Sequence, residues 1–446
     1  MYKKELLGVC MKLKLIKQKD FSLLILGKLV SLLGSNMQQF ALSLYVLSLT
    51  GSATIFASIL SISIIPRLIF SPVAGVFGDW FDRKRSIVSL DLLNSIIIGI
   101  FAVIYIINGR ISIPLIYILV ILLEVIEIFF HSAMAAVLPS IVDKEDYLEA
   151  NSFNSVAMNV GSILSPVLAA FLYGTFGMKI ILIVNSISFL LSAISEMFIN
   201  IPKSHNKPEK ISIKAFKTDF YEGVKIIKSN KLLSTMIGLG AIINFSAAPL
   251  FGIVIIYFLK EVLMVSDMQF GIFQMIFSAS MLAAPIFCGK IIKKAKIGML
   301  IYKSFLYISV LIYVIAIFTS GYAINAFNTN MFSYLGILIV SFLMGIIITV
   351  ANIALGTLFD KIVPLNIMGR TSTVFNFVIT VLMPLGQMMS GFLLDITFPS
   401  IVISISGTIL LITIIKYKFA LLDYDQNKTI KEENLHFEGG DAINEI

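Results

Sequence analysis

Apolar residues along this chain occur in long blocks that short polar turns separate. Each block has roughly 20 or more residues, the length that an α-helix needs to cross about 30 Å of hydrocarbon at about 1.5 Å per residue. Twelve blocks are predicted, at residues 20–49, 53–78, 86–108, 113–138, 150–173, 178–200, 232–259, 267–292, 298–320, 331–358, 370–394 and 397–416. The pattern therefore predicts an all-α integral membrane protein with twelve transmembrane helices.

Composition supports this class. The chain is 58% hydrophobic and 13% charged over 446 residues, whereas soluble domains average about 45–50% apolar and about 25% charged residues. Cys10 and Cys288 are the two cysteines. Neither has a second cysteine or a histidine at metal-ligand spacing, so we expect no disulfide framework, no metal site and no cofactor.

One long polar interruption divides the blocks into six plus six. The predicted organisation is a basic N-terminus (1–19), a first six-helix bundle (20–200), a linker (201–231), a second six-helix bundle (232–416) and a polar tail (417–446) that we expect to be disordered. In the linker one helical face carries Ile213, Phe216, Phe220, Val224 and Ile227 among lysines. This predicts a basic amphipathic helix on the membrane surface; a solvated linker is the alternative.

Positive charge gathers at one set of helix ends. The lysines of the N-terminus, linker and tail and the Arg83–Arg85 cluster fall on one side, and Arg110, Lys179 and Lys260 fall on the other. The positive-inside rule then predicts that both termini are cytoplasmic. The net charge of +8 is explained by this topology and by anionic lipid, so it gives no reason to expect a nucleic-acid partner.

The turn between the second and third blocks reads "GVFGDWFDRKRS", residues 75–86. It resembles the loop signature of the major facilitator superfamily, which Gly75, Asp79, Arg83 and Lys84 match and from which Trp80 and Asp82 depart. The resemblance implies a cytoplasmic latch in which the aspartate faces the positive end of a helix from the other bundle. The alternative is that the basic residues only set topology.

Asp91, near the inner end of the third block, is expected to join this latch by pairing with Arg83 or Lys84.

The fifth block contains "NVGSILSPVLAA", residues 159–170. It resembles the antiporter motif of exporters in the same family, through Gly161, Ser165, Pro166, Ala169 and Ala170. Small residues four apart let helices approach closely, so helix packing is the alternative explanation. Pro384 in the eleventh block occupies the position in the second half that corresponds to Pro166 in the first. Parallel duplicated halves predict such a correspondence.

Residues 130–155 and 369–395 resemble the macrolide-efflux-type branch of that family. The resemblance covers residues 20–416 and implies two pseudo-symmetric six-helix bundles that work by alternating access. The implied activity is proton-driven export of lipophilic drugs. The branch also contains siderophore exporters, so the resemblance leaves the cargo open.

The stretch "LLEVIEIFFH", residues 122–131, places three ionisable groups in an apolar helix. Glu124, Glu127 and His131 are spaced i, i+3 and i, i+4 and therefore share one helical face. A charge in lipid costs about 2.5–3.5 kcal/mol, so this face should line protein or water. We expect Arg67 to pair with Glu124 and Glu127 to carry a proton. The alternative is that Arg67 and Lys28 neutralise both acids and that the two acids serve only assembly.

The resemblance also implies that helices 1, 4, 7 and 10 line a central cavity. Asn36, Gln39, Asn244 and Asn352 lie on these helices. Each is expected either to contact substrate or to bond a neighbouring helix.

The function that these features predict is proton-coupled export of lipophilic or amphipathic small molecules, such as macrolide-like drugs, across a bacterial plasma membrane. The expected partners are that substrate, protons and lipid, and the expected state is a monomer. An exporter of a native metabolite or siderophore and a non-transporting membrane sensor remain alternatives. No GxxxxGK[ST], HExxH or GxSxG motif occurs at a plausible site, so we expect neither an enzyme nor an ATP-driven pump.

Overall fold

The computed structural model describes residues 15, 17–80, 82–135, 137–143, 146–202, 221–222, 224–326, 330–363 and 368–441. Within these ranges the regular structure is entirely helical. The chain divides into two compact units: unit 1 is Met1–Ile213 with Met264–Ile276, and unit 2 is Lys214–Leu263 with Phe277–Ile446. Unit 1 thus includes Met264–Ile276, a segment that the predicted organisation assigns to the second bundle.

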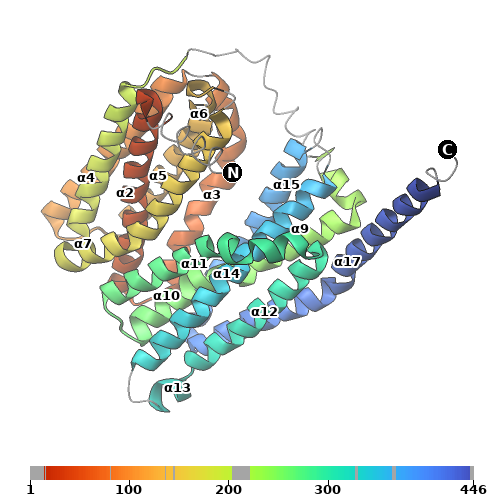
Figure 1. Cartoon of the computed structure of the whole chain (residues 1–446). Helices are drawn as coiled ribbons and strands as arrows, with labels where there is room; N and C mark the ends of the chain where they lie inside the picture. The colour runs from red at the N-terminus through yellow and green to blue at the C-terminus, as the bar shows by residue number, and fades with distance from the viewer. Residues whose placement is uncertain are drawn as a thin grey trace, which may run out of the picture. The chain divides into compact units, whose positions relative to one another are not determined.

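Unit 1 is a bundle of long helices that run side by side (Figure 1). They are α2 (Lys19–Thr50), α3 (Ala53–Trp80), α4 (Arg83–Asn108), α5 (Ile113–Ala135), the short α6 (Val137–Ile141) and α7 (Tyr147–Met197). The ends follow local chemistry. Asp82 accepts a hydrogen bond from the Arg85 amide at 3.0 Å and caps α4, and Gly51 ends α2 with a left-handed backbone, φ 60°.

Helix α7 contains two of the predicted blocks. Its backbone leaves the helical region at Gly177, with φ 72° and ψ −171°. Both of its ends lie beside the same end of α2, because Asn154 accepts a hydrogen bond from Lys28 and Ser195 donates one to the Leu23 carbonyl. The chain therefore doubles back near Gly177. This explains why 11 helices in the described part of the chain are long and apolar enough to span a membrane although twelve blocks are predicted.

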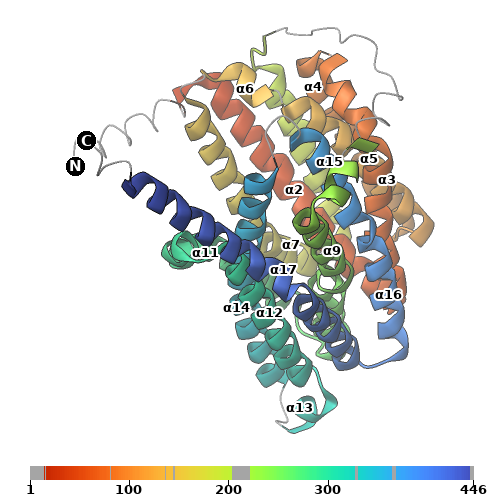
Figure 2. The same ribbon diagram turned by 90° about the vertical axis from the view of Figure 1, so that its right-hand side faces the viewer.

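Unit 2 begins with one nearly continuous helix, made of α9 (Lys231–Ser246), η2 (Leu250–Val254), α10 (Ile255–Tyr257) and η3 (Phe258–Val262). It continues through α11 (Asp267–Lys294), whose first residues belong to unit 1. The remaining helices are α12 (Ile297–Phe318), α13 (Gly321–Ala326), α14 (Asn330–Ile362), α15 (Met368–Val381), α16 (Met383–Ile396) and α17 (Pro399–Asp441). Figure 2 shows α12 and α17 side by side. The eleventh block is interrupted at Leu382, next to Pro384.

The expectation of a disordered tail from residue 417 is wrong, because α17 continues to Asp441. No proline or glycine occurs between residues 417 and 438 to end the helix. The first part of the extension is also anchored. The Asp425 carboxylate accepts hydrogen bonds from the Gly298 and Met299 amides at 3.0 and 2.7 Å, at the first turn of α12.

The predicted amphipathic helix of the linker lies mostly outside the described residues, which omit 203–220 and 223. Residues 224–229 are helical, and Ile227 is buried.

Candidate functional site

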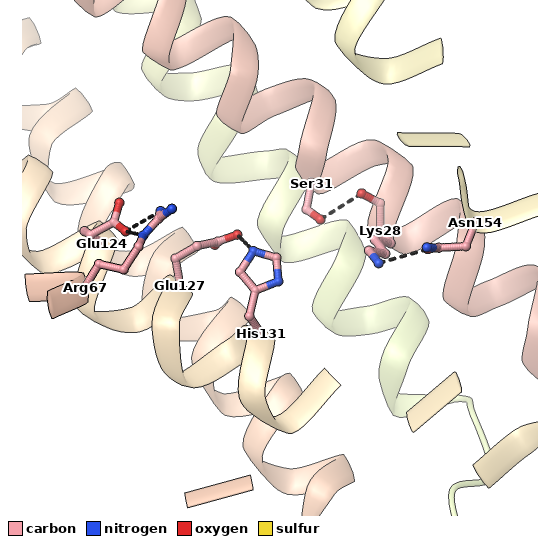
Figure 3. Close-up of polar contacts among 7 residues, drawn as sticks. All are labelled: Lys28, Ser31, Arg67, Glu124, Glu127, His131 and Asn154. Atoms are coloured by element: carbon pink, nitrogen blue, oxygen red, sulfur yellow. Dashed lines mark hydrogen bonds and ion pairs between the residues drawn. The ribbon is translucent and has the colours of Figure 1, made fainter. Parts of the chain in front are cut away.

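Arg67 of α3 and Glu124 of α5 form an ion pair inside unit 1 (Figure 3). Arg67 Nε lies 2.8 Å and Nη2 lies 2.5 Å from the same oxygen, Glu124 Oε1. The Glu124 side chain is 15% exposed and that of Arg67 is 59% exposed. The carboxylate is thus sheltered among the helices while the guanidinium reaches it from a more open side.

Glu127 lies one helical turn from Glu124 and contacts His131, whose Nε2 is 3.0 Å from Glu127 Oε1. In the view of Figure 3 this pair lies between the Arg67–Glu124 pair and Lys28 of α2. The charge of Glu127 acts on Lys28, yet Lys28 Nζ donates a hydrogen bond to Asn154 Oδ1 at 2.9 Å. The hydrogen-bond partner of Lys28 is therefore an amide and not either of the two acids.

The Arg67–Glu124 and Glu127–His131 pairs line a cavity of about 300 Å³ within unit 1. The predicted residues Asn36, Gln39, Arg67, Glu124, Glu127 and His131 all lie on its wall. Apolar side chains complete it, among them Leu32, Val46, Phe56, Leu60, Val120 and Phe189. A wall that combines apolar side chains with converging polar groups is typical of a small-molecule site, and here polar residues make up more than half of the lining.

The cavity wall also includes polar residues that the sequence analysis missed. Asn185 Nδ2 donates to Gln38 Oε1 at 2.7 Å and joins α7 to α2. A signal for it was present, since Asn185, Ser188, Ser192 and Glu196 are spaced three or four residues apart in an otherwise apolar block. That spacing puts them on one face of the helix.

Asn244 and Asn352 line a separate hollow of about 380 Å³ within unit 2. Asn244 Nδ2 donates to the Ile379 carbonyl at 2.8 Å, so this side chain joins α9 to α15. Asn352 of α14 is exposed. A part in substrate binding stays a prediction for both residues.

The motif of the fifth block provides close contacts. Ser165 is buried and its hydroxyl donates to the Gly161 carbonyl at 2.6 Å. A Cβ at Gly161 would lie 2.7 Å from Leu32 Cδ2. A Cβ at Gly271, on the first part of α11, would lie 2.6 Å from Ala170 Cβ and 2.9 Å from the Pro166 carbonyl oxygen. Ala169 is buried beside them. The small residues thus allow α7 to contact α2 and α11 closely.

The predicted latch is described only in part. Gly75 and Asp79 belong to α3, but their side chains lie outside the described residues. Asp91 does not form the expected hydrogen-bonded pair with Arg83 or Lys84, because within the described residues neither of its carboxyl oxygens has a hydrogen-bond partner. Its neighbours are Ser192, Glu196 and Glu127, because the side chain is directed into the bundle.

Comparison with known proteins gives concordant results. The chain is 26% identical to the uncharacterized MFS-type transporter YkuC of Bacillus subtilis over 425 residues, or 92% of this chain and 94% of that protein. It is also 26% identical to macrolide efflux protein A of Streptococcus pyogenes, over 226 residues that span 50% of this chain and 55% of that protein.

Solved structures share the fold. A bacterial homologue of the iron transporter ferroportin, in an inward-facing state, superposes with a TM-score of 0.71 at 16% identity, covering 90% of this chain and 99% of that one. The POT family transporter PepTSo gives a TM-score of 0.69 at 9% identity, covering 91% and 98%.

The family model of the Major Facilitator Superfamily matches residues 24–387. This match agrees with the division of the apolar pattern into two halves and with the polar groups inside unit 1. The chain is a multi-pass membrane transporter and belongs to the Major Facilitator Superfamily.

Proposed function

We propose that this transporter exports lipophilic or amphipathic small molecules in exchange for protons. The observation that carries the proposal is the placement of Glu124 and Glu127 on one cavity wall in different states of pairing. Arg67 holds Glu124 through two hydrogen bonds, whereas Glu127 contacts His131 and is more exposed than Glu124, 36% against 15%. Glu127 is therefore the carboxyl group with the greater freedom to change its charge.

A change of charge at Glu127 supplies the coupling. A transporter that exchanges cargo for protons needs a site that binds a proton in one state and releases it in the other. Cationic cargo that enters the cavity competes with a proton for the Glu127 carboxylate, so the two are bound alternately. The apolar remainder of the wall suits the hydrocarbon part of an amphipathic cargo.

Macrolide-like compounds are the first cargo class to test. The similarity to macrolide efflux protein A supports this choice, although it spans about half of either chain. The bacterial relatives support a plasma-membrane location, and the distribution of lysine and arginine supports cytoplasmic termini.

The decisive experiment uses inside-out vesicles that contain the full-length protein. Respiration acidifies the vesicle interior, macrolides and other amphipathic amines are added in turn, and a lumenal dye reports the internal pH. We expect at least one compound to drain protons from wild-type vesicles, and we expect Glu127→Gln vesicles to retain them. Asp143→Asn, which removes an exposed acid in a turn of the same unit, is the matched control and should behave as wild type.

Two outcomes would contradict the proposal. Normal proton drainage by Glu127→Gln would remove this residue from the coupling. Accumulation of a compound without proton movement in any variant would show that another ion, or no ion, drives transport.

A further inference from the structure

Two acidic residues of unit 1 are buried away from the Glu124–Glu127 pair. Asp91 of α4 is 0% exposed and Glu196 of α7 is 2% exposed. Acidic side chains are almost never fully buried unless they are paired with a cation or otherwise satisfied. The proposed export cycle assigns neither of them a role.

Three of the four carboxyl oxygens of these acids are buried without a hydrogen-bond partner within the described residues. Both carboxyl oxygens of Asp91 and Oε2 of Glu196 have no hydrogen-bond partner there. Two polar residues on the same helices also carry oxygens without a hydrogen-bond partner there, namely Asn94 Oδ1 and Ser192 Oγ. Asn94 is 1% exposed and Ser192 is 0% exposed. Asn94 lies one turn after Asp91, and Ser192 lies one turn before Glu196. Helices α4 and α7 pack against each other, so four buried side chains with unpartnered oxygens lie on two neighbouring helices.

The electrostatic surroundings of the cluster are acidic. The Asp91 carboxyl group lies near the Ser192 hydroxyl without a hydrogen bond between them, and the charges of Glu196 and Glu127 act on it. Glu127 itself contacts His131, and its charge acts on Lys28 of α2. Arg83 begins α4 two turns before Asp91. The interactions that reach Asp91 from α5 and α7 thus come from a hydroxyl and from two further carboxyl groups.

Two carboxylates cannot both be ionised in such a place. Transfer of a charged carboxylate out of water is so costly that the group binds a proton instead, unless a cation compensates it. Two carboxyl groups that share a site ionise one after the other, because like charges repel. The Ser192 hydroxyl can donate to one carboxylate while it accepts from a protonated carboxyl group.

We propose that Asp91 and Glu196 form a proton-sharing carboxyl pair that exchanges its proton with Glu127. The polar shell of the pair reaches the cavity, because Asn94 lies on the cavity wall together with Glu127. The pair thereby adds a second proton-holding site behind the wall. The exchange with Glu127 rests on the proposed function, whereas the sharing of a proton within the pair does not.

A lipid-soluble carbodiimide tests the pair directly, because this reagent reacts with protonated carboxyl groups in apolar surroundings. The full-length protein in phospholipid nanodiscs is treated with dicyclohexylcarbodiimide at neutral pH, and labelled peptides are identified by mass spectrometry. We expect label on Glu196 or Asp91 and none on the exposed Asp143. When labelling is repeated over a series of pH values, label on Glu196 should disappear at a lower pH in Asp91→Asn than in the wild type, because the repulsion from Asp91 is gone while the burial remains.

Glu196→Gln gives the reciprocal comparison at Asp91, and the elution profile of each variant on size exclusion shows whether it has folded. If a variant fails to fold, the wild-type labelling pattern decides alone. Label on the pair no stronger than on Asp143 would overturn the proposal, because the pair would then be ionised.

Two further arms separate the remaining cases. Five unpartnered oxygens are also hard ligands suited to a small cation. Protection of the pair when sodium chloride replaces choline chloride at equal concentration would therefore show a sodium site and overturn the shared proton. Glu127→Gln should change the label on the pair by at least twofold, and unchanged label would overturn the exchange with Glu127. Because labelling needs no cargo, failure of export in the vesicle assay leaves these results readable.

Discussion

The guanidinium of Arg67 and the carboxylate of Glu124 meet at a single oxygen, Oε1, which accepts from both Nε and Nη2. The second oxygen of Glu124 takes no part in this contact. Arg67 thus fixes one edge of the carboxylate and leaves the other edge to the cavity, whose wall includes both residues. Arg67 thus pairs with the sheltered acid without closing the cavity.

Loss of Arg67 should destabilise the protein through Glu124. The pair is partly exposed, so Arg67→Gln should lower the free energy of unfolding by about 1–2 kcal/mol, between the values for surface and for buried pairs. Thermal unfolding in detergent measures the change. Arg110→Gln removes an exposed arginine from a turn of the same unit and should have little effect. Adding Glu124→Gln to Arg67→Gln should restore part of the loss, since it removes the uncompensated acid; an additive loss in the double variant would contradict the pairing.

His131 should affect transport less than Glu127 does. His131→Gln keeps an amide donor one turn from Glu127 and should retain most of the export rate, whereas His131→Phe should lower it by about tenfold, since it removes one charge-assisted hydrogen bond worth about 1.5–3 kcal/mol. Vesicle transport at a fixed pH gradient gives both rates. Equal rates for the two variants would show that the contact between Glu127 and His131 has no part in the cycle.

The contact of α11 with α7 should depend on Gly271. A Cβ there meets both Ala170 Cβ and the Pro166 carbonyl, so Gly271→Ala should cost about 1–3 kcal/mol through overpacking. Ala170→Gly removes one of the two obstacles and should restore part of the stability when combined with Gly271→Ala. The coupling between the two changes follows from a double-mutant cycle of thermal unfolding.

Gly252→Ala is the matched control for Gly271→Ala. Nothing lies within 4 Å of a Cβ built at Gly252, so this variant should unfold at or above the wild-type temperature. A loss as large as that of Gly271→Ala would show that the cost comes from helical glycine in general and not from the contact with α7.

The C-terminal extension should be needed as far as Asp425 and dispensable beyond it. Asp425→Ala removes the acceptor for two amides at the start of α12 and should cost about 1 kcal/mol, as the loss of an N-terminal cap does. Asp423→Ala, at an exposed position of the same turn, should be neutral. Truncation after residue 420 should destabilise the protein, and truncation after residue 430 should not. Equal unfolding temperatures for both truncations would contradict the role of Asp425.

The helical blocks could be predicted from sequence because lipid leaves the backbone of a spanning segment little choice except a helix. For the same reason, helical spacing alone predicts that Glu124, Glu127 and His131 share one face of their helix. Arg67 could be matched to Glu124 because both stand near the middle of their blocks. That reasoning uses depth in the membrane and needs no knowledge of how the helices are arranged.

Other features depend on which helices are neighbours, and the sequence does not contain that information in a local form. Glu196 stands near the end of a block, where an acid is expected at a boundary; it is buried because neighbouring helices of unit 1 pack against α7. Asp91 was assigned to the latch because Arg83 is close in sequence, whereas its neighbours come from α5 and α7. Asp425 lies in a polar run, and its partner amides are more than 120 residues away.

Gly177 has a consequence for how the protein is made. Its backbone lies in a region of φ and ψ that is essentially open to glycine alone, and there the chain doubles back without a loop. The two apolar segments of α7 are therefore synthesised one directly after the other, without a long polar stretch between them. They should enter the bilayer together as a helical hairpin. A bulkier residue at Gly177 would disfavour the backbone conformation of the turn, so the two segments would tend to form one straight helix that is longer than a membrane is thick.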